Sequence, residues 1–356
     1  MGLSFYKGKR VLVTGHSGFK GSWLTMWLGR LGAELCGVSL PPETEPNHFR
    51  LLNPPGRSEW CDIRDAEKLG SVLREFRPEI IFHLAAQPLV RLSYRKPVDT
   101  LAVNVGGTVN LLEAARNVPE LRAVVVVTSD KCYRNSEKAE GYRENDPLGG
   151  YDPYSASKGC KELFAASHRD SFLRAAGGGI ATARAGNVIG GGDWAADRLV
   201  PDLVRAAAAG AVEPLRSPSA VRPWQHVLEP LGGYLLLGQR LLEGDAAAAS
   251  AWNFGPETAD ALTVGEVAAL MNRFWPRVGF RFAPPADAPH ETKLLRLDCT
   301  KAARDLGWRG VWNAEECIRR TAGWYRGYYD SGRINTAADL EAYVADAARK
   351  GLSWTN

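Results

Sequence analysis

Residues 10–30 read "RVLVTGHSGFKGSWLTMWLGR" and combine an apolar strand, a glycine-rich loop and a helical segment. Gly15, Gly18 and Gly21 recur every three residues in this loop. Glycine permits the tight turn and lets the backbone approach a pyrophosphate, whose charge the helix N-terminus stabilises. A glycine triplet alone is weak evidence, but its place between a strand and a helix predicts a dinucleotide site.

Short apolar runs and helical patterns alternate through the rest of the first half. Strands buried on both faces need not alternate in polarity, which accounts for "VVVV" at 124–127. The alternation predicts an α/β fold, a Rossmann-type doubly wound parallel sheet with helices on both faces. The predicted strands are 10–14, 34–40, 59–61, 80–84, 123–128 and 180–185, and the predicted helices are 22–30, 66–76, 103–116 and 154–174.

The chain changes character after residue 186, where turn-rich segments such as "GNVIGGGDW" (186–194) begin. We expect a smaller, mixed α/β C-terminal domain that binds the substrate, with a helix over 201–210. The chain is expected to return to the first domain around 227–242. The predicted division is 1–186 with a return segment 222–258 for the cofactor-binding domain, and 187–221 with 259–356 for the substrate-binding domain.

The amino-acid composition and net charge limit the kinds of molecule that the protein is expected to bind. The chain has 356 residues, 45% hydrophobic and 24% charged, with a net charge of +4 spread along its length. This argues against nucleic acid and membrane surfaces as main partners and is compatible with an anionic small molecule. Six widely spaced cysteines without a Cys-x-x-Cys pair favour buried thiols in a reducing cytosol over disulfides or a metal site. We expect a soluble, cytoplasmic protein that uses no metal.

The residue that selects between NAD and NADP is ambiguous. Ser39 ends the second predicted strand, where a dinucleotide site often has Asp or Glu. Lys20, inside the glycine loop, could favour an extra phosphate. Asp62 and Ile63 follow the third strand and could hold an adenine edge; alternatively, Asp62 belongs to the N-cap of a helix that begins near Asp65.

Polar side chains follow the most hydrophobic strand. Thr128, Ser129, Asp130 and Lys131 come directly after "VVVV", at the carboxyl end of a predicted parallel strand, where ligands bind in such sheets. The segment 154–158 then places a tyrosine and a lysine four residues apart, on one face of a helix. A nearby positive charge lowers the pKa of a phenol and lets it act as a base. Together with the glycine loop, this pattern predicts a redox active site.

With these motifs, the chain resembles the extended short-chain dehydrogenase/reductases that act on nucleotide sugars. The likeness rests on the glycine loop, "HLAAQ" (83–87), "NVGGT" (104–108), Ser129 and the Tyr-x-x-x-Lys pair at 154–158, and it covers nearly the whole chain. Sugar-nucleotide 4,6-dehydratases usually carry Asp-Glu after the catalytic hydroxyl residue, whereas this chain has Asp130-Lys131. "TSDKCY", "GHSGFKGSW" and "RPWQHVLEP" resemble the CDP-glucose 4,6-dehydratase subfamily, in which lysine replaces the glutamate.

The resemblance implies an internal redox cycle on CDP-glucose with NAD. Tyr154 would take the 4-hydroxyl proton, Ser129 would bind the reacting oxygen, and Lys158 would orient the cofactor ribose and tune Tyr154. Asp130 would protonate the departing 6-hydroxyl, with Lys131 as either the C-5 base or the enolate stabiliser. The implied cofactor contacts are Gly15, Ser17, Gly18, Phe19, Gly21, Asp62, Ile63, Leu84, Ala85, Ala86, Gln87, Asn104, Thr128, Tyr154 and Lys158, and the implied substrate contacts are Asn187, Arg198, Arg222, His290 and Glu291.

Other functions remain open at this point. Another nucleotide-sugar 4,6-dehydratase or a 4-epimerase would share the fold, cofactor, tyrosine and lysine, although an epimerase needs no acid and amine at C-5 and C-6. A non-catalytic NAD-sensing protein could dispense with the tyrosine and lysine altogether. The apolar helices at 103–116 and 154–174 suggest a homodimer through a four-helix bundle, with a tetramer as the alternative.

Overall fold

A seven-stranded parallel sheet forms the centre of the computed structural model, which describes residues 3–173, 178–257, 261–283 and 294–355. The strand order is β11-β6-β5-β4-β1-β2-β3, so the chain reverses direction across the sheet between β1 and β4. The predicted fold class is confirmed. The strands are β1 Arg10–Thr14, β2 Glu34–Ser39, β3 Arg57–Trp60, β4 Ile80–His83, β5 Ala123–Val127, β6 Gly179–Ala185 and β11 Ala251–Phe254.

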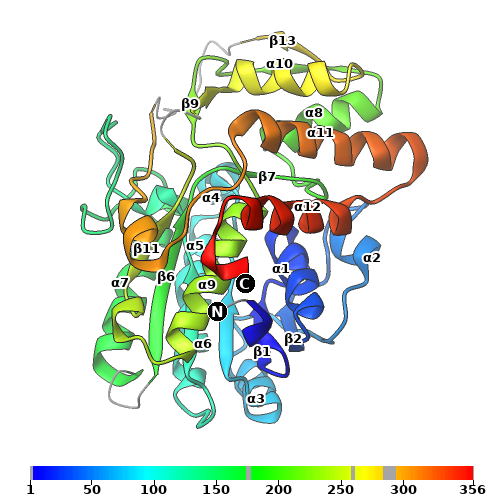
Figure 1. Cartoon of the computed structure of the whole chain (residues 1–356). Helices are drawn as coiled ribbons and strands as arrows, with labels where there is room; N and C mark the ends of the chain where they lie inside the picture. Colours follow the sequence, from blue (N-terminus) through cyan, green and yellow to red (C-terminus); the bar gives the residue numbers. More distant parts are fainter. Residues whose placement is uncertain (1–2, 174–177, 258–260, 284–293, 356) are drawn as a thin grey trace.

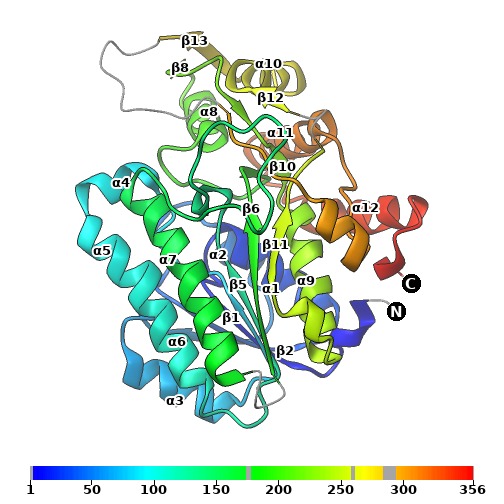
Figure 2. The same cartoon turned by 90° about the vertical axis from the view of Figure 1, so that its left-hand side faces the viewer.

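Helices cover both faces of this sheet (Figures 1 and 2). Successive side chains of β5 point to opposite faces, so Val124 and Val126 join one apolar cluster and Val125 joins the other. The first cluster includes residues of α3, α6 and α7, and the second includes residues of α1, α9 and α12. These helices are α1 Phe19–Arg30, α3 Ala66–Phe76, α6 Gly107–Ala115, α7 Pro153–His168, α9 Leu228–Leu242 and α12 Thr336–Arg349.

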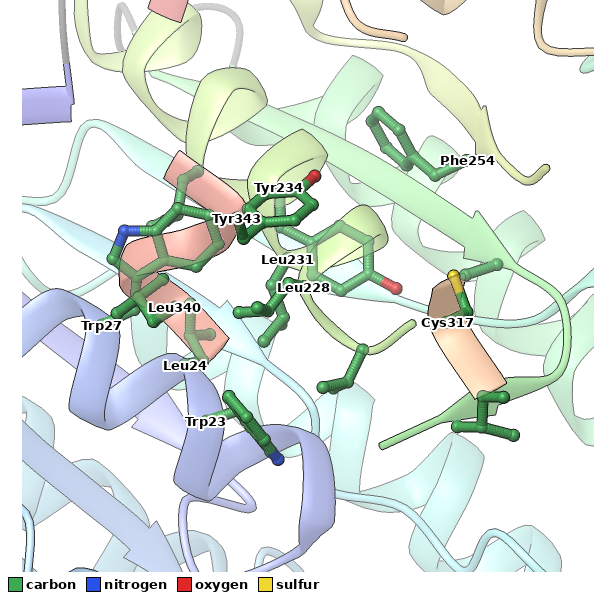
Figure 3. Packing of buried hydrophobic residues seen from close by; sticks show 14 of the residues in the cluster. Trp23, Leu24, Trp27, Leu228, Leu231, Tyr234, Phe254, Cys317, Leu340 and Tyr343 are labelled. Atoms are coloured by element: carbon green, nitrogen blue, oxygen red, sulfur yellow. The ribbon is translucent and has the colours of Figure 1, made fainter. Parts of the chain in front are cut away.

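The C-terminal helix α12 is held against the sheet layer by aromatic packing. Figure 3 shows Trp27 of α1, Leu231 of α9 and Tyr343 of α12 gathered in one cluster. The Tyr343 hydroxyl is fully buried and lies 3.0 Å from Oε2 of Glu229 on α9. Residues more than a hundred positions apart therefore close the second face of the sheet.

A second group of elements lies beyond one end of the sheet (Figures 1 and 2). It contains three two-stranded pairs, β10 with β7, β12 with β9 and β13 with β8. We call this group the cap. Its elements are β7 Val188–Ile189, α8 Leu199–Ala208, β8 Val212–Leu215, β9 Val221–Arg222, β10 Gln225–His226, β12 Leu262–Thr263, α10 Val264–Phe274, β13 Gly279–Phe282 and α11 Ala314–Ser331.

Several predicted helices differ from the observed ones. The predicted helix 154–174 is α7 followed by the π-helical turn η4 Arg169–Leu173, and the predicted helix 103–116 begins as the π-helical turn η2 Ala102–Gly106. Helix α7 starts one residue early because Asp152 accepts a hydrogen bond from the Ser155 backbone N–H and Pro153 occupies the first helical position. The remaining elements are η1 Leu3–Tyr6, α2 His48–Leu52, α4 Val90–Arg95, α5 Pro97–Leu101, η3 Asp130–Cys132, η5 Ala246–Ala248, η7 Ala302–Leu306 and η8 Ser353–Thr355.

Among the helices that the structure describes, none has both the length and the apolar character that a bilayer crossing requires.

Candidate active site

A cavity of about 870 Å³ lies between the carboxyl ends of the parallel strands and the cap. Its wall includes the glycine loop after β1, the segments that follow β2, β4, β5 and β6, and residues of α7 and α8. This is where open parallel sheets bind ligands. The volume lies towards the upper end of the usual range for ligand sites, about 300–1,000 Å³.

The glycine loop has the geometry that a dinucleotide requires. Gly15 has φ +74°, and a Cβ there would lie 2.8 Å from the backbone N of Ala85. A Cβ at Gly21 would lie 2.0 Å from the carbonyl oxygen of Gly15, so helix α1 packs directly on the loop. Gly18 is the N-cap of α1, and Gly18 and Phe19 line the cavity, so the N-terminus of this helix lies at the cavity wall, where it would stabilise an anion.

Neutral groups surround Ser39 at the adenosine end of this loop. The Ser39 hydroxyl lies 2.7 Å from Oγ of Ser17 and 3.1 Å from Nδ1 of His16. Burial lowers the pKa of His16 to about 4, so the ring is uncharged at neutral pH. Lys20 does not reach this end: its Nζ lies 3.4 Å from the hydroxyl of Tyr234 on α9. The idea that Lys20 binds an extra ribose phosphate is therefore wrong, because its side chain turns towards α9.

The other residues predicted to contact the cofactor line the cavity, with one exception. Asn104 is fully buried behind the cavity wall. Its Oδ1 accepts from the backbone N–H of Gln87 at 2.7 Å, and its amide donates to Oγ of Ser157 at 2.9 Å. The residues that line the cavity are Gly15, Ser17, Gly18, Phe19, Gly21, Asp62, Ile63, Leu84, Ala85, Ala86, Gln87, Thr128, Tyr154 and Lys158.

Asp62 and Asp65 have separate tasks. The Asp62 carboxylate pairs with the guanidinium of Arg64, with Nη2 at 2.6 Å from Oδ2, and this lowers the pKa of Asp62. Asp65, not Asp62, is the N-cap of α3 and accepts from the Lys68 backbone N–H at 3.0 Å. The alternative reading of Asp62 as a helix cap is wrong.

Tyr154 and Lys158 occupy the first half of α7 and face the cavity. The Lys158 Nζ lies 5.6 Å from the centre of the Tyr154 ring, and burial lowers the pKa of Lys158 to about 8. Burial raises the pKa of Tyr154 to about 12, against the lowering effects of a hydrogen bond with Ser129 and the charge of Arg198. The protein's cations alone therefore do not bring the pKa of Tyr154 below its usual value, because desolvation is the larger effect. The lowering expected from an oxidised nicotinamide stays a prediction.

Ser129, Asp130 and Lys131 form a short turn at the end of β5. The Ser129 hydroxyl donates to Oδ1 of Asp130 at 2.8 Å, and Nζ of Lys131 lies 3.8 Å from the same oxygen. Ser129 and Lys131 line the cavity, whereas Asp130 is only 1% exposed. Its Oδ2 is buried and has no hydrogen-bond partner in the described part of the chain.

A glycine lies over the unpartnered oxygen of Asp130. Gly186 lines the cavity, and a Cβ there would lie 3.2 Å from Oδ2. An unsatisfied buried oxygen costs free energy, which a hydrogen bond from a ligand hydroxyl would recover. Oδ2 is therefore the oxygen of this turn that the described residues leave without a hydrogen bond.

The predicted substrate residues are partly accounted for. Asn187, Arg198 and Arg222 line the cavity on the cap side. Arg198 also pairs with Asp193, with Nη1 at 2.8 Å from Oδ2. His290 and Glu291 lie outside the described residues.

Sequence reasoning missed the residues that support this site. The Ser93 hydroxyl of α4 accepts from the backbone N–H of Tyr154 at 3.1 Å. Glu162 and Arg184 are buried beneath the Ser129 turn and pair at 2.8 Å. Glu162 could have been noticed, because it continues the face of α7 one turn beyond Lys158.

The arrangement thus joins a dinucleotide loop, a buried tyrosine–lysine pair and a carboxylate–ammonium turn around one cavity. Comparison with known proteins agrees with this arrangement of the site. The chain is 49% identical over 332 residues to the CDP-glucose 4,6-dehydratase of Salmonella typhimurium, covering 91% of this chain and 92% of that protein. It also resembles solved structures of nucleotide-sugar enzymes.

One of these structures is a double mutant of DesIV, a dTDP-glucose 4,6-dehydratase from Streptomyces venezuelae solved with NAD bound. It is 25% identical, has a TM-score of 0.77, and the match covers 91% of this chain and 99% of that one. Another is the epimerase Mth375 of Methanothermobacter thermautotrophicus, 26% identical with a TM-score of 0.80 over 92% and 95% of the two chains. The family model described as GDP-mannose 4,6 dehydratase matches residues 12–321. The predicted relationship to nucleotide-sugar enzymes is confirmed, and the chain belongs to the GDP-mannose 4,6-dehydratase family.

Proposed function

We propose that this protein converts CDP-D-glucose to CDP-4-dehydro-6-deoxy-D-glucose and water, the activity of a CDP-glucose 4,6-dehydratase, in the synthesis of deoxysugar precursors. The observation that carries the reaction class is the Asp130–Lys131 pair, placed beside Ser129 at the cavity that Tyr154 also lines. The choice of CDP-glucose is supported by 49% identity to the Salmonella typhimurium enzyme over nearly the full length of both chains.

The cofactor in this proposal is NAD. The glycine loop and the open N-terminus of α1 suit its pyrophosphate, and the uncharged His16 and Ser39 at the adenosine end provide no cation for an additional phosphate. DesIV, a related 4,6-dehydratase, was solved with NAD bound. When bound, NAD would supply reversible hydride acceptance, so that the sugar is oxidised and reduced within one turnover.

The side chains then divide the proton transfers. Tyr154 would take the proton of the 4-hydroxyl, and Ser129 would donate a hydrogen bond to the same sugar oxygen. The 4-ketone acidifies the C-5 hydrogen. A neutral Lys131 would take this proton as the base; as an ammonium ion, Lys131 would instead stabilise the enolate while solvent water takes the proton. Asp130 would give a proton to the 6-hydroxyl, which departs as water. The product differs from the substrate by the loss of one water molecule, with no net oxidation or reduction. No external oxidant is therefore needed.

Tyr154 needs help to act as a base. Burial raises its pKa to about 12, so the phenol is protonated at neutral pH before ligands bind. A positive charge close to the ring would lower this pKa, and the oxidised nicotinamide carries one. Lys158, with a pKa of about 8, adds a further cation near the same ring.

The cap would hold the nucleotide. Arg198 and Arg222 present guanidinium groups to the cavity, and this group matches phosphate geometry. We assign residues 1–186 with 222–258 to the cofactor-binding domain, and 187–221 with 259–356 to the substrate-binding domain. Two elements depart from this division, because β10 pairs with β7 in the cap and α12 packs on the second face of the sheet. The position of β11, which pairs with β6 in the central sheet, supports the return segment.

The proposal includes a homodimer in the cytoplasm. The sequence suggests the helices at 103–116 and 154–174 for this interface, but the large apolar residues of α6, Leu111 and Leu112, are buried. Exposed apolar side chains lie instead on α5 and α7, with Val98 at 77%, Leu101 at 43% and Leu163 at 61%. These helices lie side by side on one flank of the molecule (Figure 2), as a four-helix interface requires. Buried thiols such as Cys36 and Cys132 suit a reducing compartment.

Incubation of the purified protein with CDP-, UDP- and TDP-glucose tests the function. We expect the alkaline ultraviolet band of a 4-keto sugar with CDP-glucose, deuterium incorporation at C-5 in heavy water, and loss of the 6-hydroxyl. Preferred turnover of TDP-glucose would overturn the substrate. Interconversion of 4-hydroxyl epimers without loss of water would show an epimerase, and bound NAD without any turnover would favour a sensing protein.

A further inference from the structure

A buried ion pair beneath the Ser129 turn has no part in the chemistry described so far. Arg184 of β6 and Glu162 of α7 are each about 3% exposed, and Nη2 of Arg184 lies 2.8 Å from Oε2 of Glu162. Neither residue lines the cavity. The pair therefore acts on a ligand only through the residues that it holds.

Glu162 holds the residue that precedes the turn. The Thr128 hydroxyl donates to Oε1 of Glu162, and the Thr182 hydroxyl of β6 donates to Oε2 at 2.6 Å. The backbone N–H of Thr128 also donates to the carbonyl oxygen of Ala183 at 2.9 Å. The carboxylate thus ties the ends of β5 and β6 together where β5 gives way to Ser129.

Arg184 holds the residue that follows the turn. Its Nη1 donates to the hydroxyl of Tyr133 at 2.7 Å and to the carbonyl oxygen of Glu144 at 2.9 Å. The guanidinium carbon lies 4.8 Å from the centre of the Tyr133 ring. The Tyr133 hydroxyl in turn donates to Oδ1 of Asn253 on β11 at 2.8 Å. Three neighbouring strands are thus connected to the far side of the turn.

The backbone of Tyr154 is positioned by other contacts, although its hydroxyl is hydrogen-bonded to Ser129 at the start of the turn. Its backbone N–H donates to Ser93, and the N-terminus of its helix is capped by Asp152. Glu162 lies two turns further along α7. Loss of the Tyr133 hydroxyl should therefore displace Asp130 and Lys131 more than it displaces Tyr154.

We propose that the Glu162–Arg184 pair is the positioning device of the elimination step: it fixes both ends of the Ser129–Cys132 turn and so aims Asp130 and Lys131 at the sugar. The proposal rests on the dehydratase function proposed above. Glu162, Arg184 and Tyr133 are positioning residues, because they act through the turn. Small misplacement of reacting groups is costly, since a shift of about 1 Å can lower a rate by about a hundredfold.

The test compares Tyr133→Phe with Tyr6→Phe. Both remove one buried tyrosine hydroxyl that makes a hydrogen bond, but the Tyr6 hydroxyl donates to the carbonyl oxygen of Leu235, far from the turn. Two quantities are measured after mixing with CDP-glucose in heavy water. Absorbance of the reduced cofactor at 340 nm reports the removal of the C-4 hydride. Deuterium incorporation at C-5 reports the elimination step.

For Tyr133→Phe we expect C-5 exchange to fall by about tenfold or more, while cofactor reduction changes by less than about threefold, so that reduced cofactor accumulates. Tyr6→Phe should leave both rates as in the wild type. Equal loss of both rates in Tyr133→Phe, or loss of neither, would overturn the proposal. The wild-type arm separately tests the proposed function, which fails if no nucleotide sugar gives either signal.

Thr182→Val and Thr182→Ser provide a second comparison if Tyr133→Phe does not fold. Valine removes the hydroxyl that donates to Glu162 with little change of shape, and serine keeps it. Because Glu162 acts on the Ser129 end of the turn, the valine variant should lose C-5 exchange and, through Ser129, part of the cofactor reduction. The serine variant should keep both. Identical behaviour of the two variants would contradict a positioning role.

Discussion

Lys131 and Asp130 share one oxygen: Nζ of Lys131 lies 3.8 Å from Oδ1 of Asp130, which also accepts a hydrogen bond from Ser129. The second carboxylate oxygen has no partner among the described atoms and lies beneath Gly186 at the cavity wall. One oxygen thus orders the turn, and the other receives no hydrogen bond from the described residues.

Lys131→Met should remove the C-5 chemistry and leave the oxidation. A general base contributes about 10²–10⁴-fold and one group that stabilises a developing oxyanion about 10²–10³-fold, so in either role C-5 exchange should fall by about 10²-fold or more while the bound cofactor is still reduced. Because Lys131 pairs with Asp130, we expect it to act as a cation, and Lys131→Arg should keep more C-5 exchange than the methionine variant. Equal inactivity of both variants would instead assign Lys131 as the base. Wild-type exchange in Lys131→Met would exclude either role.

Tyr154→Phe should abolish removal of the C-4 hydride, because the phenol is the group placed to take the 4-hydroxyl proton. Cofactor reduction after addition of CDP-glucose is expected to fall by at least about 10²-fold. The amount of NAD that copurifies or binds in titration should match the wild type, since the ring remains. Turnover at the wild-type rate would refute the role of Tyr154.

Lys161→Met should stabilise the protein. Lys161 is fully buried, its Nζ has no hydrogen-bond partner within the described residues, and burial lowers its pKa far below the usual value of 10.5. The unfolded chain therefore binds a proton that the folded chain excludes, so wild-type stability rises with pH up to about 10.5. Removing the amine should add about 1–3 kcal/mol at pH 7.

Urea unfolding at pH 7 and pH 9 checks this expectation. The gain from Lys161→Met should be larger at pH 7 than at pH 9. Lys7→Met, a change at an exposed lysine, serves as the control and should leave stability within about 0.5 kcal/mol at both values. A destabilised Lys161→Met protein would mean that the ammonium has a partner that keeps it charged.

Leu163→Arg should convert the proposed dimer to a monomer. Leu163 is 61% exposed on α7, and an arginine there would bring a charge into an apolar four-helix contact. Sedimentation at micromolar concentration should show the change. Val212→Arg is the matched control, because Val212 is 53% exposed on β8 of the cap, away from α5 and α7 (Figure 2). A wild-type protein that is already monomeric would contradict the proposed assembly.

Much of the active site could be predicted because it follows local patterns. The glycine loop, the hydroxyl–acid–amine run after β5 and the tyrosine–lysine pair are each contained within a few residues, and parallel strands bring their carboxyl ends to one edge. The supporting contacts could not be predicted this way. Ser93 reaches Tyr154 across 61 positions, and Tyr133 reaches Asn253 across 120.

The sequence by itself determined which segments of the first half form strands and helices, and which strands carry polar groups at their ends, because propensity, periodicity and turn chemistry act between near neighbours. It did not fix every boundary, since several helices begin at other residues than predicted. Only the tertiary structure decided that β11 joins the sheet beside β6, that Lys20 turns to Tyr234, and that Asp130 keeps one buried oxygen without a partner. It also decided the direction of the Tyr154 pKa, which rises. The physical reason is that desolvation and long-range hydrogen bonds depend on which distant segments pack together, and no local pattern records that.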